Sequence, residues 1–199
     1  GWTTPSVAPG AYRRIKIGVK PLAGATGNEV KNALLTATSV SDDTKQDAVG
    51  ADTTCLVDYR PDGIIYSGST PLGDGIYNTN GTGQTSSAGV APGRTATYEV
   101  RLYNDGTGRD TFGVSGTAGD SNWSVKYEDR ATGTDITAAV TGAGWASPAL
   151  NPRSYRRIKV YVSPGPSVAP NAALSVLLTA ASTVDATKRD AVKATTTRR

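Results

Sequence analysis

An internal repeat constrains this sequence more than any other feature. Residues 1–54 align with residues 144–197 without a gap, and 26 of the 54 aligned positions are identical. The identities include the stretch Tyr-Arg-Arg-Ile-Lys, which occurs at residues 12–16 and again at 155–159. A copy of this length at a fixed offset is the signature of tandem structural units.

The first occurrence of the repeat is incomplete. Residues 1–54 match only the last part of the unit that ends at residue 197. We therefore expect a C-terminal half-unit followed by one full unit, and we interpret the start at Gly1 as a processed product or a slice of a longer protein. A β-sandwich cut in half would expose its core and several strand edges. We expect further repeats of the same protein, or strands donated by another chain, to cover that surface.

Composition excludes several functional classes. The 199 residues contain no histidine and one cysteine, Cys55, so the commonest general base is absent and no internal disulfide or cysteine-cluster zinc site can form. The formal net charge is only +4, which predicts no nucleic-acid partner. No apolar run approaches the roughly 20 residues of a membrane-spanning helix, so we expect no membrane span. We also expect no cofactor.

Alternating hydrophobicity predicts an all-β fold. Apolar side chains occupy every second position in residues 97–103, 122–127 and 156–162. Turn signals such as Asn104-Asp105-Gly106 recur at intervals of roughly 8–15 residues, a spacing typical of a β-sandwich. We found no convincing amphipathic helix. The predicted fold is one complete β-sandwich preceded by the C-terminal half of a homologous one.

The predicted domain organisation has three parts. Residues 1–54 form the partial repeat, 55–95 form a junction with lead-in strands, and 96–199 form the core of the complete sandwich. Both copies of the Tyr-Arg-Arg-Ile-Lys stretch are expected to be strands, and in the second copy Ile158 is expected to face inward while Arg157 and Lys159 face outward.

Several motifs of the full unit carry a family resemblance. They are Asn104-Asp105-Gly106-Thr107-Gly108 followed by Asp110-Thr111-Phe112, then Trp123-Ser124-Val125, and Leu178-Thr179-Ala180-Ala181-Ser182 near the end. This order resembles the NEW3-like or CARDB-like Ig repeats of bacterial and archaeal secreted surface proteins. The turn at Asn151-Pro152-Arg153 departs from the family's Pro-Gly, which Ala8-Pro9-Gly10 keeps. The resemblance implies an Ig-like sandwich in an extracellular setting, where such modules serve as spacers, stalks, filament subunits or enzyme appendages.

No residue set predicts catalysis. The adjacent carboxylate pairs Asp42-Asp43 and Glu128-Asp129 are expected in turns, and neighbouring strand residues would point to opposite faces rather than across a cleft. Asp and Asn residues at 58, 62, 74, 78 and 80 offer oxygen ligands for Ca²⁺, but no fixed ligand spacing is present, and turn formation explains them as well. We therefore predict no catalytic residue and no metal site, and a protein that is not an enzyme.

The candidate sites concern modification and interaction. Two sequons make Asn80 and Asn122 candidate glycosylation sites, of which Asn80 is expected to be the more accessible. Cys55 is expected to be a buried thiol at the junction, with an intermolecular disulfide as the alternative. Six basic side chains are candidates for binding an acidic polysaccharide, or else form solvated strand faces that resist aggregation. They are Arg13, Arg14, Lys16, Arg156, Arg157 and Lys159.

Two hypotheses about function follow. The first is a structural, non-enzymatic extracellular repeat protein of a cell-surface stalk or filament, which would assemble as a homo-oligomer or with neighbouring repeats of the same protein, with inter-subunit strand complementation as one route. The alternative is a carbohydrate-binding or spacer module of a large secreted enzyme or adhesin. The alternative predicts exposed, coplanar aromatic rings, with Tyr103, Tyr127 and Tyr161 as the candidates.

Overall fold

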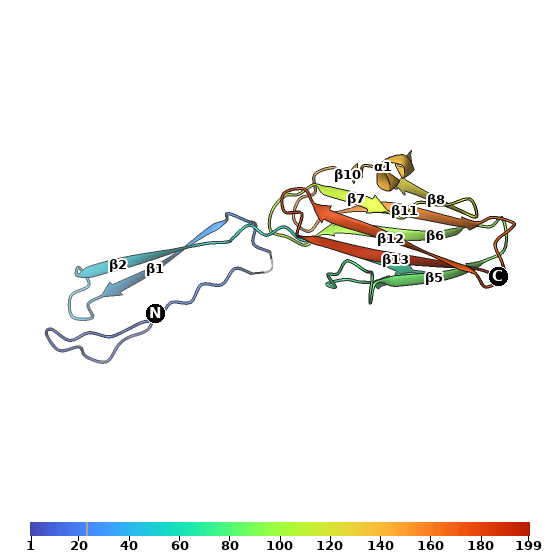
Figure 1. Ribbon diagram of the computed structural model, residues 1–199. Coiled ribbons are helices and arrows are strands. Elements are labelled where there is room, and N and C mark those ends of the chain that lie inside the picture. The colour runs from blue at the N-terminus through green and yellow to red at the C-terminus, as the bar shows by residue number, and fades with distance from the viewer. Residues whose placement is uncertain (23) are drawn as a thin grey trace. The chain divides into compact units, whose positions relative to one another are not determined.

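The computed structural model describes residues 1–22 and 24–199, which divide into two compact units, Gly1–Cys55 and Leu56–Arg199 (Figure 1). We call them the first unit and the second unit. In the described residues, no helix is long and apolar enough to cross a membrane.

One layer of the second unit is a six-stranded sheet in the order β4-β3-β6-β11-β8-β9. All neighbouring strands in this sheet are antiparallel. Its strands are β3 (Pro61–Ser67), β4 (Thr70–Leu72), β6 (Ala96–Asn104), β8 (Trp123–Asp129), β9 (Thr134–Asp135) and β11 (Tyr155–Pro164).

The other layer is a five-stranded sheet in the order β10-β7-β12-β13-β5. Its strands are β5 (Thr85–Val90), β7 (Phe112–Gly116), β10 (Trp145–Ala146), β12 (Ala173–Ser182) and β13 (Arg189–Arg198). The edge strand β5 runs parallel to β13, and the other pairs are antiparallel. A five-residue helix, α1 (Thr137–Thr141), precedes β10 and buries Val140.

The hydrophobic core lies between the two sheets, and the alternation in the sequence supplies it. Val100 on β6, Ile158 on β11 and Val192 on β13 are all buried. Each such side chain stabilises the fold by roughly 1.5–3 kcal/mol. The sheets approach closely at Gly63 of β3, where an added Cβ would lie 2.9 Å from Val192 Cγ1. The second unit is an Ig-like β-sandwich, as the alternation predicted.

The first unit contains one β-hairpin, which reproduces a hairpin of the second. Strands β1 (Val30–Thr38) and β2 (Gln46–Thr54) pair with Leu35 opposite Val49. Their repeat counterparts, β12 and β13, pair with Leu178 opposite Val192, which is the same register. The chain therefore carries the C-terminal half of a second homologous sandwich, as predicted.

The tip of the hairpin also repeats. The backbone N–H of Thr44 donates to Asp42 Oδ1 at 3.1 Å, and that of Thr187 donates to Asp185 Oδ1 at 3.0 Å. These Asx-type bonds connect residues two apart and need no help from other strands. Turn and register are therefore encoded within the hairpin itself.

The prediction of a strand at residues 12–16 is wrong. In the second unit the same five residues open β11, which pairs with β6 on one side and β8 on the other. Among the described residues of the first unit, no strand corresponds to β6 or β8, and residues 12–16 adopt no regular structure. A central strand forms only when both neighbours satisfy its backbone groups.

Candidate assembly interface

The core face of the β1–β2 hairpin is exposed, although its sequence is that of a buried hairpin. Val49 is 58% exposed, whereas its repeat counterpart Val192 is 1% exposed. Other identical pairs change in the same direction, from exposed or half-buried in the first unit to buried in the second. They are Leu35/Leu178, Ala37/Ala180, Ala48/Ala191, Ala51/Ala194 and Thr53/Thr196.

The segment before the hairpin shows the same contrast. Ile15 is 49% exposed, while Ile158 is fully buried in the core of the second unit. Of the sixteen exposed large hydrophobic side chains found in the described residues, ten belong to the first unit, which holds only 55 of 199 residues. Such a concentration of exposed apolar surface is typical of a surface that another polypeptide covers.

Both edges of the β1–β2 hairpin lack a strand partner within the described part of the first unit. In the second unit the corresponding edges are occupied, since β7 pairs with β12 and β5 pairs with β13. Edge strands present a row of backbone donors and acceptors that can template pairing with a further chain. The interface thus offers two strand edges as well as an apolar face.

The buried Asp190 carboxylate on β13 accepts hydrogen bonds from the N-terminal part of the second unit. Asp190 Oδ2 accepts the Gly63 N–H at 2.7 Å, and Asp190 Oδ1 accepts the Asn78 N–H at 2.8 Å. Gln84 Nε2 donates to Oδ1 at 2.8 Å. The repeat counterpart, Asp47, is exposed, and its Oδ1 accepts the N–H of the next residue, Ala48, at 2.9 Å. These three donors all precede residue 85, in a part of the unit that has no counterpart among the described residues of the first unit.

Two acids in this region have raised pKa values. Burial, with the nearby Asp190 carboxylate, raises the pKa of Asp62 to about 7, although the Gly75 N–H donates to Asp62 Oδ2 at 3.1 Å. Burial likewise raises the pKa of Asp190. Asp62 Oδ1 and Gln84 Oε1 are buried without a hydrogen-bond partner. No cluster of three or more acidic or cysteine side chains suited to a metal ion occurs in the part of the chain that the structure describes.

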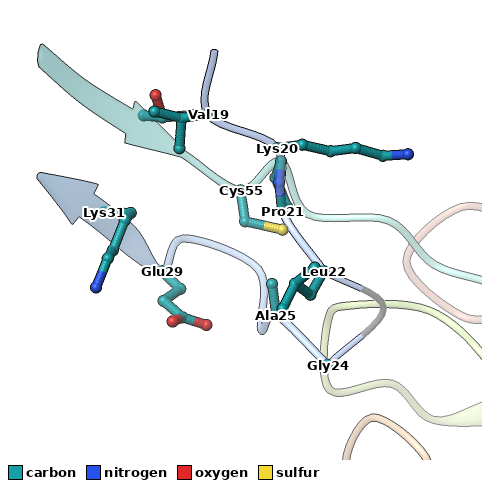
Figure 2. A pocket seen from close by; sticks show the side chains of 10 residues that line it. Val19, Lys20, Pro21, Leu22, Gly24, Ala25, Glu29, Lys31 and Cys55 are labelled. Atoms are coloured by element: carbon teal, nitrogen blue, oxygen red, sulfur yellow. The ribbon is translucent and has the colours of Figure 1, made fainter. Parts of the chain in front are cut away.

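Cys55 lies at the end of the hairpin, on the wall of a pocket of about 390 Å³ in the first unit (Figure 2). Pro21, Leu22 and Glu29 line the same pocket. The Cys55 N–H donates to the Glu29 carbonyl oxygen at 2.9 Å, which joins the strand end to the preceding loop. Cys55 is 7% exposed, so it is buried, as expected.

The basic candidates fall on different surfaces. Arg156 lies on the inward side of β11 and forms an ion pair with the Asp129 carboxylate. Arg157, on the opposite face, places its Nε 3.7 Å from Glu99 Oε1. Lys159 is half-buried on that outer face, whereas Arg13, Arg14 and Lys16 are exposed in the first unit.

The ion pair of Arg156 also corrects an expectation, because Glu128 and Asp129 lie in β8 rather than in a turn. Burial alone would raise the pKa of Asp129, but hydrogen bonds from Arg156, the Ala131 N–H and Thr132 hold it below its ordinary value. The ion pair between Arg156 and Asp129 therefore links the beginning of β11 to β8.

The outer face of the six-stranded sheet carries a tyrosine–arginine stack, of which sequence reasoning named only Tyr103. The Arg101 guanidinium lies 4.6 Å from the Tyr66 ring centroid and 4.9 Å from that of Tyr155. Tyr155 also stacks on Tyr103 at 6.2 Å between centroids, with 19° between the ring planes. The strand register places Tyr155 opposite Tyr103, and no short-range pattern signals this. Tyr127, which was expected on such a surface, is instead fully buried.

Both sequon asparagines are exposed. Asn80 Oδ1 accepts the Thr82 N–H at 3.0 Å, within the loop that precedes β5. Asn122 lies directly before the buried Trp123, and its Oδ1 accepts a hydrogen bond from Ser167 Oγ at 3.1 Å. Both candidate glycosylation sites are thus open to solvent.

No family model and no curated protein matches this sequence. Solved structures resemble it at low sequence identity. The major pilin subunit BcpA of Bacillus cereus shares 9% identity over 84% of this chain and 47% of the pilin, with a TM-score of 0.36. Domains 4 and 5 of the S-layer protein SbsC share 14% identity over 94% of this chain and 86% of that structure, with a TM-score of 0.33.

A family 123 glycoside hydrolase from Clostridium perfringens shares 8% identity over 58% of this chain, with a TM-score of 0.34. This chain spans 23% of that hydrolase and about half of the pilin subunit. Likenesses at this level carry no argument about function.

Proposed function

We propose that this chain is a structural, non-enzymatic component of an extracellular stalk or filament, built from Ig-like units that complete one another by strand pairing. The observation that carries the proposal is the exposed core face of the β1–β2 hairpin. Identical side chains are buried at the counterpart positions of the second unit, so the first unit has the sequence of a core, and its described residues include no strands that cover it.

Assembly follows from the energetics of that surface. Covering one large apolar side chain stabilises a complex by roughly 1.5–3 kcal/mol, and pairing the two edges satisfies backbone groups along β1 and β2. The unfinished half can therefore be joined to a further unit that supplies the missing strands. The motif resemblance to secreted Ig-like repeats supports an extracellular setting for this assembly.

The proposal predicts a regular assembly of the native material. Negative-stain electron microscopy of the protein purified from its source, together with its intact mass, should show filaments or beaded stalks with a repeat of one Ig-like unit. Compact single particles that contain no tandem units would contradict the proposal.

The alternative, a carbohydrate-binding surface, is favoured by one observation, the stacked Tyr103 and Tyr155 rings beside Arg101. If this surface binds an acidic polysaccharide, Tyr155→Ala should weaken retardation in a polysaccharide affinity gel roughly tenfold, because a stacking partner and a cation–π contact are lost. The matched control is Tyr12→Ala, at the repeat counterpart, which should leave retardation unchanged. Equal migration of the parent and Tyr155→Ala proteins would exclude this function for the stack.

A further inference from the structure

The number of repeat halves in the sequence limits which segments can cover the first unit. The chain contains two C-terminal halves, residues 1–54 and 144–197, but one covering segment, residues 56–143. In the structure that segment already covers residues 144–197, through β3, β5 and β7 among others. These 199 residues therefore contain one more C-terminal half than they can cover.

A second copy of the chain cannot remove this excess by exchanging strands. If one copy lent residues 56–143 to the first unit of another, its own residues 144–197 would lose their partner strands. Any ring or filament of these 199 residues that forms by exchange keeps one uncovered half for each copy. Exchange would expose Val192 and Ile158 in order to bury Val49 and Ile15, so it gains no net burial.

We infer that the first unit is the docking site for a separate polypeptide segment that repeats the strands of residues 56–143 and comes from outside these 199 residues. This inference rests on the proposed function and names the partner that the assembly requires. The segment must supply one strand parallel to β2, as β5 is to β13, and one antiparallel to β1, as β7 is to β12.

The chemistry of the contact is also specified by the second unit. The partner must bring two backbone N–H groups and one side-chain amide to the Asp47 carboxylate, as Gly63, Asn78 and Gln84 do for Asp190. A glycine must face Val49, since an added Cβ at Gly63 would lie 2.9 Å from Val192 Cγ1. Two strands of the partner must flank residues 12–16, as β6 and β8 flank β11. Asp47 is thus the residue that selects this partner.

The test appends a second copy of residues 56–143 directly before Gly1 of the full chain. The junction is native, because residue 143 is followed by Gly144, the repeat counterpart of Gly1. Hydrogen exchange followed by mass spectrometry should show amides of β1 and β2 exchanging at least about a hundredfold more slowly in the fusion than in the parent chain. A fusion with a Gly/Ser extension of equal length should show no slowing.

Asp47→Ala supplies the matched variant. In the fusion, Asp47→Ala should make the amides of β1 and β2 exchange at least about tenfold faster, because three hydrogen-bond donors would lose their acceptor. In the parent chain, where Asp47 is exposed, the same change should have no effect. Protection of β12 and β13 reports folding of the second unit in every sample.

Three results would overturn the inference. One is a fusion in which β12 and β13 are protected while β1 and β2 exchange freely. Another is a parent chain that forms a dimer with β1 and β2 already protected, which would make a second copy the occupant. The third is a monomeric parent chain that protects β1 and β2 by itself. If native filaments are observed in any of these cases, the structural role stands and only the partner is wrong.

Discussion

Val192→Asp should unfold the second unit, whereas Val49→Asp should leave the unfolding transition of the parent chain unchanged. Val192 is 1% exposed and faces Gly63 across the core, so the new carboxylate would be buried without a partner. A buried unpaired charge costs several kcal/mol, which is comparable to the roughly 5–15 kcal/mol that holds a domain folded. Val49 is 58% exposed, and its replacement removes little burial.

Thermal unfolding followed by circular dichroism, with both variants at the same protein concentration, would measure this difference. Val192→Ala serves as the milder reference, since it leaves a cavity but buries no charge. A large effect of Val49→Asp in the parent chain would show that the face of the β1–β2 hairpin is already covered, and would contradict the exposed state described above.

The second unit should lose stability on going from pH 5 to pH 8, by about 3 kcal/mol. Burial raises the pKa of Asp62 from 3.8 to about 7, so the folded unit holds a proton that the unfolded chain has already released. Stability therefore falls as the pH rises through this window and levels off above it. The raised pKa of Asp190 acts in the same direction. At pH 5 the carboxylate of Asp129, whose pKa is lowered, stays ionised and contributes no change.

Asp62→Asn should flatten this dependence and make the unit more stable than the parent at pH 8. The amide keeps an acceptor for the Gly75 N–H, which now donates to Asp62 Oδ2, and it never ionises. Urea denaturation at both pH values would measure the change. Asp120→Asn, which neutralises an exposed carboxylate elsewhere in the second unit and keeps its Oδ1 acceptor, is the control and should keep the full pH dependence. Equal stability of the parent protein at pH 5 and pH 8 would refute the prediction.

Much of the fold could be predicted because the relevant signals are local or periodic. Alternation placed Val100 and Ile158 in the core, and the structure buries both. The repeat predicted the C-terminal half of a homologous sandwich, and the two equivalent hairpins agree in register. The candidate interface followed from the same observation, since a half-sandwich must expose its inner face.

The side-chain contacts of the second unit could not be predicted in this way. Asp190 lies in a strand and would ordinarily be expected to face solvent, yet Gly63, Asn78 and Gln84 surround it. The stack of Arg101 with Tyr66 and Tyr155 likewise depends on three strands meeting in one register. These contacts join residues far apart in the chain, and no short-range pattern encodes them.

The two copies of the repeat separate what the sequence by itself determined from what the tertiary structure decided. The hairpin, its register and its Asp-Thr tip are determined by sequence, because their hydrogen bonds join residues within one short segment. The five residues Tyr-Arg-Arg-Ile-Lys form a strand at 155–159 and no regular structure at 12–16. Only the tertiary structure decides between these states, because a central strand needs a partner on each side to satisfy its backbone and bury its apolar face.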